Sequence, residues 1–195
     1  MTNKEQFIEL YTKLIHRDGG EKLLEWLCSS DFFTAPASTK FHNAKEEGLV
    51  EHSVNVYFRL KNLVDYEKKL HPQMLANITE ENIAITALLH DVCKANFYQT
   101  EFRNAKIDGV WEQIPYFTIK DSLPYGHGEK SVYILCGFVK LTRDEAMAIN
   151  WHMGGFDSRV KGGDFSLSAA FEMHPFAALM HIADIEATYL DETRN

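Results

Sequence analysis

The sequence lacks the marks of a secreted or membrane-spanning protein. It has only three cysteines, Cys28, Cys93 and Cys136, and no two of them form a CxxC pair. An odd number of cysteines among apolar neighbours is typical of reduced core residues. No run approaches the ~20 apolar residues of a membrane span, and the polar start MTNKEQFIEL has no apolar stretch of a signal peptide. We therefore expect a cytoplasmic protein that does not act at a membrane.

An excess of basic charge is also missing. Lys and Arg number 20 against 28 Asp and Glu, which gives a net charge of −8. This balance excludes a broad basic surface for a long nucleic acid and favours a small or short substrate. The 195 residues are 45% hydrophobic and contain no repeat or low-complexity tract, so we expect a single domain over 1–195. Within it, 1–30 would form an N-terminal helical extension and 31–190 the core.

Helical periodicity dominates the chain. Apolar residues recur at helical spacing in several segments, and Thr79 and Thr142 are placed as helix N-caps. The segment 96–120 differs, because aromatic and β-branched residues flank Asp108-Gly109, a strong hairpin signal. The helices are expected at about 3–16, 20–29, 46–69, 79–94, 126–140, 142–154 and from Pro175. The predicted fold is all-α with a small β-hairpin insertion at about 96–120.

Histidines and aspartates recur on the apolar sides or at the ends of these predicted helices. His52, for example, lies three residues after Leu49 and four before Val56. Buried polar groups cost free energy unless they have partners, and a shared cation is an economical partner. The residues with this placement are His52, His90, Asp91, His127, His152 and Asp184. We interpret the six as one metal site centred on the His90-Asp91 dipeptide.

The order of these residues resembles the HD-domain metal-dependent phosphohydrolase superfamily. The resemblance rests on GLVEHSVNV (48–56), LLHDVCK (88–94) and ADIEAT (183–188), and covers about 30–190. GHGEKS (126–131) and WHMGGF (151–156) add two histidines and resemble the branch with H…HD…H…H…D ligands. That branch includes binuclear HD phosphodiesterases and the HD domain of bacterial 3′–5′ exoribonucleases. The loop APASTKFHNA (35–44) is most similar to the exoribonucleases.

The resemblance implies a binuclear centre with an HD-type helical bundle around it. His52, His90, Asp91 and Asp184 would hold one metal, and Asp91 would bridge to a second held by His127 and His152. Imidazole and carboxylate ligands suit Mn, Fe, Ni, Co or Zn. A hydroxide bridging the metals would attack a phosphoester of a nucleotide or short oligonucleotide.

Other residues are candidates for contacts with the substrate. Lys94 follows His90 by one helical turn and is placed to neutralise phosphoryl charge, so we group it with Asp91 as catalytic. Lys130, one turn past His127, His42 and Arg103 are candidate substrate-binding residues. Each of these also has a structural interpretation, as a solvated surface group. For His127 and His152 the alternative is a structural histidine or a substrate contact in a mononuclear enzyme.

Two further functions fit the same residues. An HD-type di-iron oxygenase uses a similar ligand order for a redox reaction on a small substrate. A non-catalytic sensor domain would bind metal and nucleotide without turnover. The complete ligand set and Lys94 favour the hydrolase.

Overall fold

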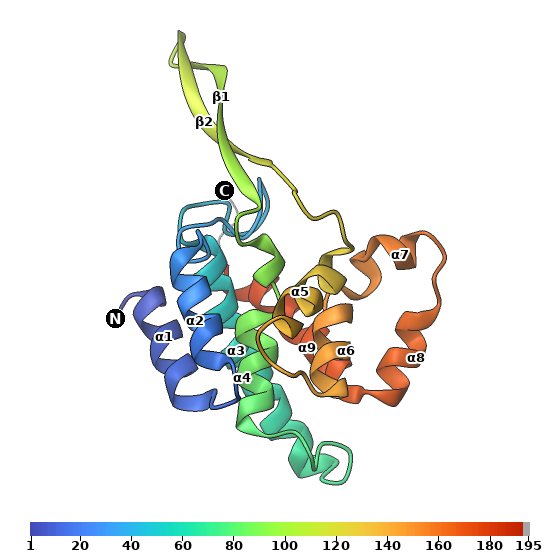
Figure 1. The fold of residues 1–195 in the computed structure, drawn as a ribbon. Coiled ribbons are helices and arrows are strands. Elements are labelled where there is room, and N and C mark those ends of the chain that lie inside the picture. Colours follow the sequence, from blue (N-terminus) through green and yellow to red (C-terminus); the bar gives the residue numbers. More distant parts are fainter. Residues whose placement is uncertain (193–195) are drawn as a thin grey trace.

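The computed structural model describes residues 1–192 and shows a bundle of helices from which one hairpin projects (Figure 1). The predicted all-α architecture with a small β insertion is confirmed. Its elements, in chain order, are α1 Asn3–Leu14, α2 Gly20–Ser29, α3 Gly48–Leu70, α4 Glu80–Leu89, η1 Val92–Lys94, β1 Tyr98–Ile107, β2 Val110–Ile119, α5 His127–Cys136, α6 Arg143–Trp151, η2 Gly154–Phe156, α7 Ser158–Lys161, α8 Ser166–Met173, α9 Pro175–Glu186 and η3 Ala187–Asp191.

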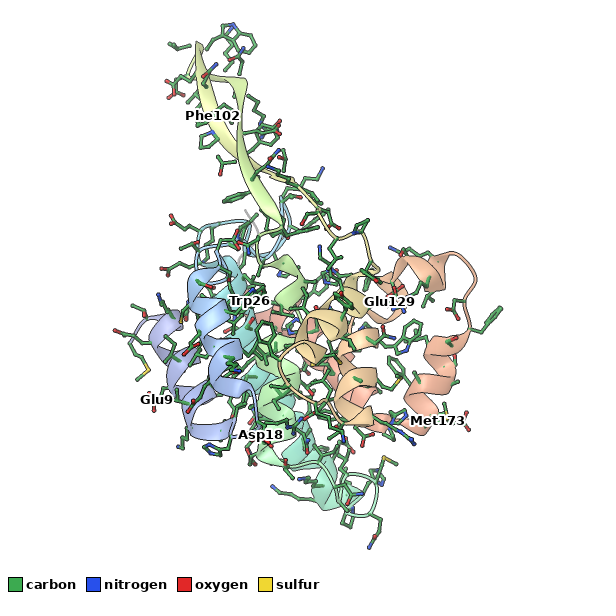
Figure 2. The ribbon with its side chains drawn as sticks, viewed as in Figure 1. Glu9, Asp18, Trp26, Phe102, Glu129 and Met173 are labelled. Atoms are coloured by element: carbon green, nitrogen blue, oxygen red, sulfur yellow. The ribbon has the colours of Figure 1, made fainter. Side chains whose placement is uncertain are left out.

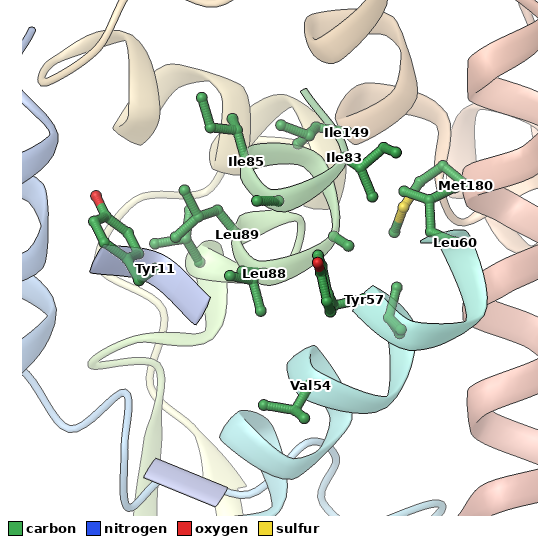
Figure 3. Close-up of a cluster of buried hydrophobic side chains, with 14 of the residues drawn as sticks. Tyr11, Val54, Tyr57, Leu60, Ile83, Ile85, Leu88, Leu89, Ile149 and Met180 are labelled. Carbon is green, nitrogen blue, oxygen red and sulfur yellow. The ribbon is translucent and has the colours of Figure 1, made fainter. Parts of the chain in front are cut away.

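Helix α4 is the centre of the bundle. Every residue from Asn82 to Leu89 is buried, so this helix has no solvent-facing side. A helix that is apolar all round must be surrounded by other elements. Figure 3 shows its side chains, Leu88 among them, meeting Tyr57 and Leu60 of α3, Ile149 of α6 and Met180 of α9. The His-Asp dipeptide follows α4 directly and so begins in the core.

The helix starts follow the predicted caps. The Thr79 hydroxyl accepts from the Asn82 backbone N–H at 3.2 Å, and the Asn82 side chain accepts from the Thr79 N–H at 2.7 Å. Thr142 and Glu145 form the same reciprocal pair at the start of α6. Each pair satisfies two backbone donors that have no partner inside the helix. These caps fix where α4 and α6 begin.

The hairpin has the predicted turn. β1 pairs with β2 in antiparallel register from Tyr98↔Ile119 to Ile107↔Val110. Asp108 and Gly109 both have positive φ, at 50° and 89°, as a two-residue type I′ turn requires. Figure 1 shows the ribbon standing away from the bundle, with only its base beside the loop that follows α2.

The expectation that all three cysteines are core residues needs correction. Cys93 is buried, but Cys28 and Cys136 are exposed, because each lies on the outward side of its amphipathic helix. The glycine-rich segment 154–164 also carries η2 and α7, where the Asp157 side chain accepts from the Arg159 N–H at 2.8 Å. Over residues 1–192, none of the helices combines the length and apolar character needed to cross a membrane.

Candidate metal centre

Two helix C-termini meet at the candidate site. His90 is the C-cap of α4 and Asp91 follows it, while His152 is the C-cap of α6. All three are almost completely buried. The C-terminal end of a helix carries partial negative charge from its last carbonyl groups, which favours a cation nearby. The backbone at these helix ends therefore favours a bound cation, as the carboxylates do.

The histidine rings are held so that their Nε2 atoms face one another. His90 Nδ1 donates to the Ala87 carbonyl at 2.8 Å, and His152 Nδ1 donates to the Ile149 carbonyl at 2.7 Å. On α3, His52 Nδ1 lies 2.7 Å from Glu192 Oε1. A carbonyl or carboxylate can only accept, so each Nδ1 carries its proton and Nε2 is left as a lone-pair donor. This is the arrangement that ligating histidines need.

The inward-facing nitrogens are crowded together, and their hydrogen bonding is incomplete. His52 Nε2 and His90 Nε2 are only 3.1 Å apart, so two lone pairs face each other unless a proton or a cation lies between them. His152 Nε2 is buried without any hydrogen-bond partner. Such groups are costly to bury. A metal ion would satisfy all three, so the donor set fits a transition metal such as Mn, Fe, Co, Ni or Zn.

Asp91 lies between two groups of nitrogens. Its Oδ2 is 3.6 Å from His52 Nε2 and 3.4 Å from His90 Nε2. Its Oδ1 is 2.7 Å from His127 Nε2 and 3.5 Å from His152 Nε2. Asp184 Oδ1 lies on the first side, 3.2 Å from His52 Nε2. The structure thus brings the six sequence-predicted residues together.

The charges in this cluster are strongly coupled. Burial alone would raise the pKa of Asp91, but the nearby Lys94 and His90, the hydrogen bond from His127 and the proximity of His152 lower it well below its usual value. Burial alone would lower the pKa of His52, yet its hydrogen bonds to Asp184 and Glu192 raise it to about 10. The carboxylates therefore stay ionised and draw a positive charge to the cluster. A metal ion bound there would supply that charge in place of the proton on His52.

His127 approaches the cluster from α5. Its first turn packs closely on the end of α6, since a Cβ at Gly128 would lie 2.2 Å from the Asn150 carbonyl oxygen. The other ring nitrogen, Nδ1, lies 3.4 Å from Cys93 Sγ. Burial raises the pKa of Cys93 to about 12, so its thiol stays protonated and acts as a contact that orients the ring.

A cavity of about 890 Å³ opens over the cluster, and Lys94 and His42 line it together with His52, Asp91, His127 and Asp184. Lys94 Nζ is 2.6 Å from Asp91 Oδ2. The structure does not bring Lys130 or Arg103 to this cavity. Lys130 is buried in an ion pair with Asp121, and its ammonium lies 4.7 Å from the centre of the Phe97 ring. Arg103 lies midway along β1, over the Tyr116 ring.

Glu192 is a site residue that the sequence reasoning missed. It lies beyond the last helical apolar stripe, in a C-terminal segment with no motif. In the structure it is buried, with Oε1 2.7 Å from His52 Nδ1 and Oε2 2.5 Å from His42 Nδ1. These bonds lower the pKa of Glu192 to about 2 even though burial opposes the charge. Only the packing of η3 against α3 shows this role.

Comparison with known proteins agrees with this geometry. A family model described as HD domain matches residues 49–189, which include all six candidate ligands. Searches of curated proteins and of solved structures gave no match. The matched segment covers more than half of the chain and runs from the start of α3 into η3. The chain therefore belongs to the HD domain family.

Proposed function

We propose that the protein is a binuclear metal-dependent phosphohydrolase that cleaves a phosphoester of a nucleotide or short oligonucleotide. HD domains are generally metal-dependent phosphohydrolases, and the His/Asp cluster is a candidate metal site. The observation that carries the binuclear assignment is Asp91. Each of its two oxygens faces a different set of imidazole nitrogens, which is the placement of a bridging carboxylate.

The ligands divide between two positions. His52, His90, Asp91 and Asp184 would hold one metal, and Asp91, His127 and His152 the other. Bound metals would polarise the phosphoryl group and lower the pKa of a water molecule so that it is a nucleophile at neutral pH. The Nδ1 bonds to Ala87, Ile149 and Glu192 keep the imidazoles oriented throughout.

Lys94 has a role of its own. Its ammonium lies beside Asp91 and lines the cavity in which a phosphoryl group would sit. Positive charge held there neutralises the charge that grows on phosphoryl oxygens in the transition state. Replacing Lys94 with Gln should lower kcat by about 10²–10³-fold. Lys94→Arg should recover part of this loss, whereas an equal loss in both variants would indicate a structural role.

The direct test is metal analysis of the purified protein, followed by assays with each metal. Substrates should include bis-p-nitrophenyl phosphate, p-nitrophenyl phosphate, nucleotides and short oligonucleotides. We expect hydrolysis that a chelator removes and a metal restores. Metal-loaded protein without hydrolysis would contradict the proposal in favour of a sensor, and substrate-dependent oxygen consumption with ferrous iron would favour an oxygenase.

The second metal has a separate test. His127→Ala and His152→Ala should each lower the metal content towards one ion per chain. His71→Ala is the matched control, because His71 is an exposed histidine whose Nε2 lies 3.8 Å from Glu67 Oε2, outside the candidate centre. One ion per chain in the control and in both site variants would mean that the enzyme is mononuclear, and two ions in all three would mean that neither histidine holds the second metal.

A further inference from the structure

A second cavity adjoins the one over the metal centre. It has a volume of about 700 Å³ and lies between the loop that follows α2 and the base of the hairpin, which Figure 1 shows side by side. Thr39, Lys40 and Tyr98 line both cavities. These three residues therefore form the border between the two cavities.

The second cavity is suited to a flat ring. Its walls include Pro36 from the loop and Tyr98, Pro115, Tyr116 and Phe117 from the hairpin. Aromatic side chains at the border of such a cavity offer stacking surfaces for a nucleobase, and stacking tolerates any base. Its volume lies within the usual range for a small-molecule site.

The two cavities differ in the charged groups that line them. The second cavity holds the carboxylates of Asp31 and Glu46, and its cation, Lys40, stands at the boundary shared with the first. Carboxylates repel a phosphate but accept hydrogen bonds from the hydroxyl and amino groups of a nucleoside. A phosphate that links two nucleosides fits best beside Lys40.

The walls of this cavity are held in place before any ligand arrives. The Tyr98 hydroxyl donates to the Ala37 carbonyl at 3.3 Å, which joins the hairpin to the loop. The Asn96 backbone N–H donates to Asp31 Oδ1 at 2.5 Å at the start of the hairpin. A site that is formed in advance loses less entropy when it binds.

We propose that the second cavity is a nucleoside subsite, so that the preferred substrate carries at least two linked nucleosides. This inference rests on the proposed phosphohydrolase function. The terminal phosphate would reach the metal centre, the first nucleoside would lie in the first cavity, and the second would stack beside Phe117. Lys40 would face the phosphate between them.

The test is calorimetric titration of the metal-loaded protein with two ligands. One is 5′-phosphorylated dithymidylate and the other is thymidine monophosphate, both with phosphorothioate groups that resist hydrolysis. The dinucleotide should bind about fivefold or more tightly than the mononucleotide, the lower end of the range for one stacked base. Phe117→Ala should remove this difference and leave mononucleotide binding unchanged.

Two further variants make the result specific. Thr34 is exposed and lines only the second cavity, so Thr34→Trp should block the subsite even if Phe117→Ala folds poorly. Phe102→Ala is the matched control, because Phe102 shares the hairpin face of Phe117 but lines neither cavity.

The outcomes separate the two proposals. Equal affinity for both ligands, or equal effects of the Phe117 and Phe102 variants, would overturn the subsite. Because the titration measures binding, a dinucleotide preference that Thr34→Trp abolishes would support the subsite even if no hydrolysis were found. Hydrolysis of bis-p-nitrophenyl phosphate without any dinucleotide preference would leave the enzyme and remove the subsite.

Discussion

The metal centre and the outer hairpin, the part of β1 and β2 that projects from the bundle, differ in which side chains are buried. Around the centre, polar side chains are buried. The carboxylate of Asp91 by itself faces Lys94 and the imidazoles of His90, His127 and His152. Along the outer hairpin, apolar side chains are exposed, with Phe102 64% and Trp111 70% accessible. Figure 2 shows Phe102 on the ribbon, well away from the bundle.

The difference shows in which region a substitution should change the free energy of unfolding most. A buried charge without partners is expensive, so each residue of the centre depends on the others. An exposed side chain on a two-stranded ribbon has few neighbours, so its removal changes little. The fold can tolerate change in the outer hairpin but not in the centre, and the following substitutions test this.

The largest effect is expected for Asp91→Ala. This change removes both oxygens that face the imidazole groups and leaves the Lys94 ammonium without its partner. Metal content and hydrolysis should both fall below detection, as measured by elemental analysis and by an assay with bis-p-nitrophenyl phosphate. Hydrolysis at the wild-type rate would show that the site is elsewhere.

A large loss of stability is expected for Leu88→Ala. Leu88 is fully buried in α4, the helix that leads into the His-Asp dipeptide. Removing a buried leucine side chain costs about 2–5 kcal/mol, depending on how far the core can relax. Urea unfolding followed by circular dichroism measures this cost. A loss of less than 1 kcal/mol would mean that α4 is not the centre of the core.

A moderate effect is expected for Glu192→Gln. The amide keeps the size of the side chain but loses the charge that faces His52 and His42. Loss of a partner that orients a metal-ligating histidine typically lowers metal affinity 10–100-fold. Competition with a chelator gives the affinity directly. Unchanged affinity would restrict Glu192 to a structural role at the C-terminal end.

The smallest effect is expected for Trp111→Ala. Trp111 lies near the tip of the hairpin, opposite Lys106, and lines neither cavity. The free energy of unfolding should change by no more than about 0.5 kcal/mol, and metal content should stay at the wild-type value. A clear loss of stability would show that the outer hairpin packs against something and would end the contrast with the centre.

Local signals in the sequence predicted the elements well. Thr79 and Thr142 marked helix starts, and Asp108-Gly109 marked the hairpin, because caps and type I′ turns depend on residues a few positions apart. Exposure was predicted less well. Cys28 and Cys136 have apolar neighbours in sequence, yet lie on the outer faces of their helices.

The candidate site was predictable where a polar residue lies at an apolar position of a predicted helix. His52, His90 and Asp184 lie on apolar sides or ends of helices, where a polar group calls for a partner. Lys130 has the same kind of sequence position, but its ammonium is taken up by Asp121 and the Phe97 ring. Which cation faces the cavity depends on its side-chain partners, and these come together only in the folded chain.

The sequence by itself indicated the helical class, the hairpin and the six residues of the candidate centre, because periodicity, caps, turns and short motifs depend on residues close together in the chain. Only the tertiary structure decided how the two oxygens of Asp91 are shared between the imidazole nitrogens, that Glu192 orients His52, and that a second cavity adjoins the first. These features join residues far apart in the chain. The packing of α3, α4, α6 and η3 brings those residues within bonding distance.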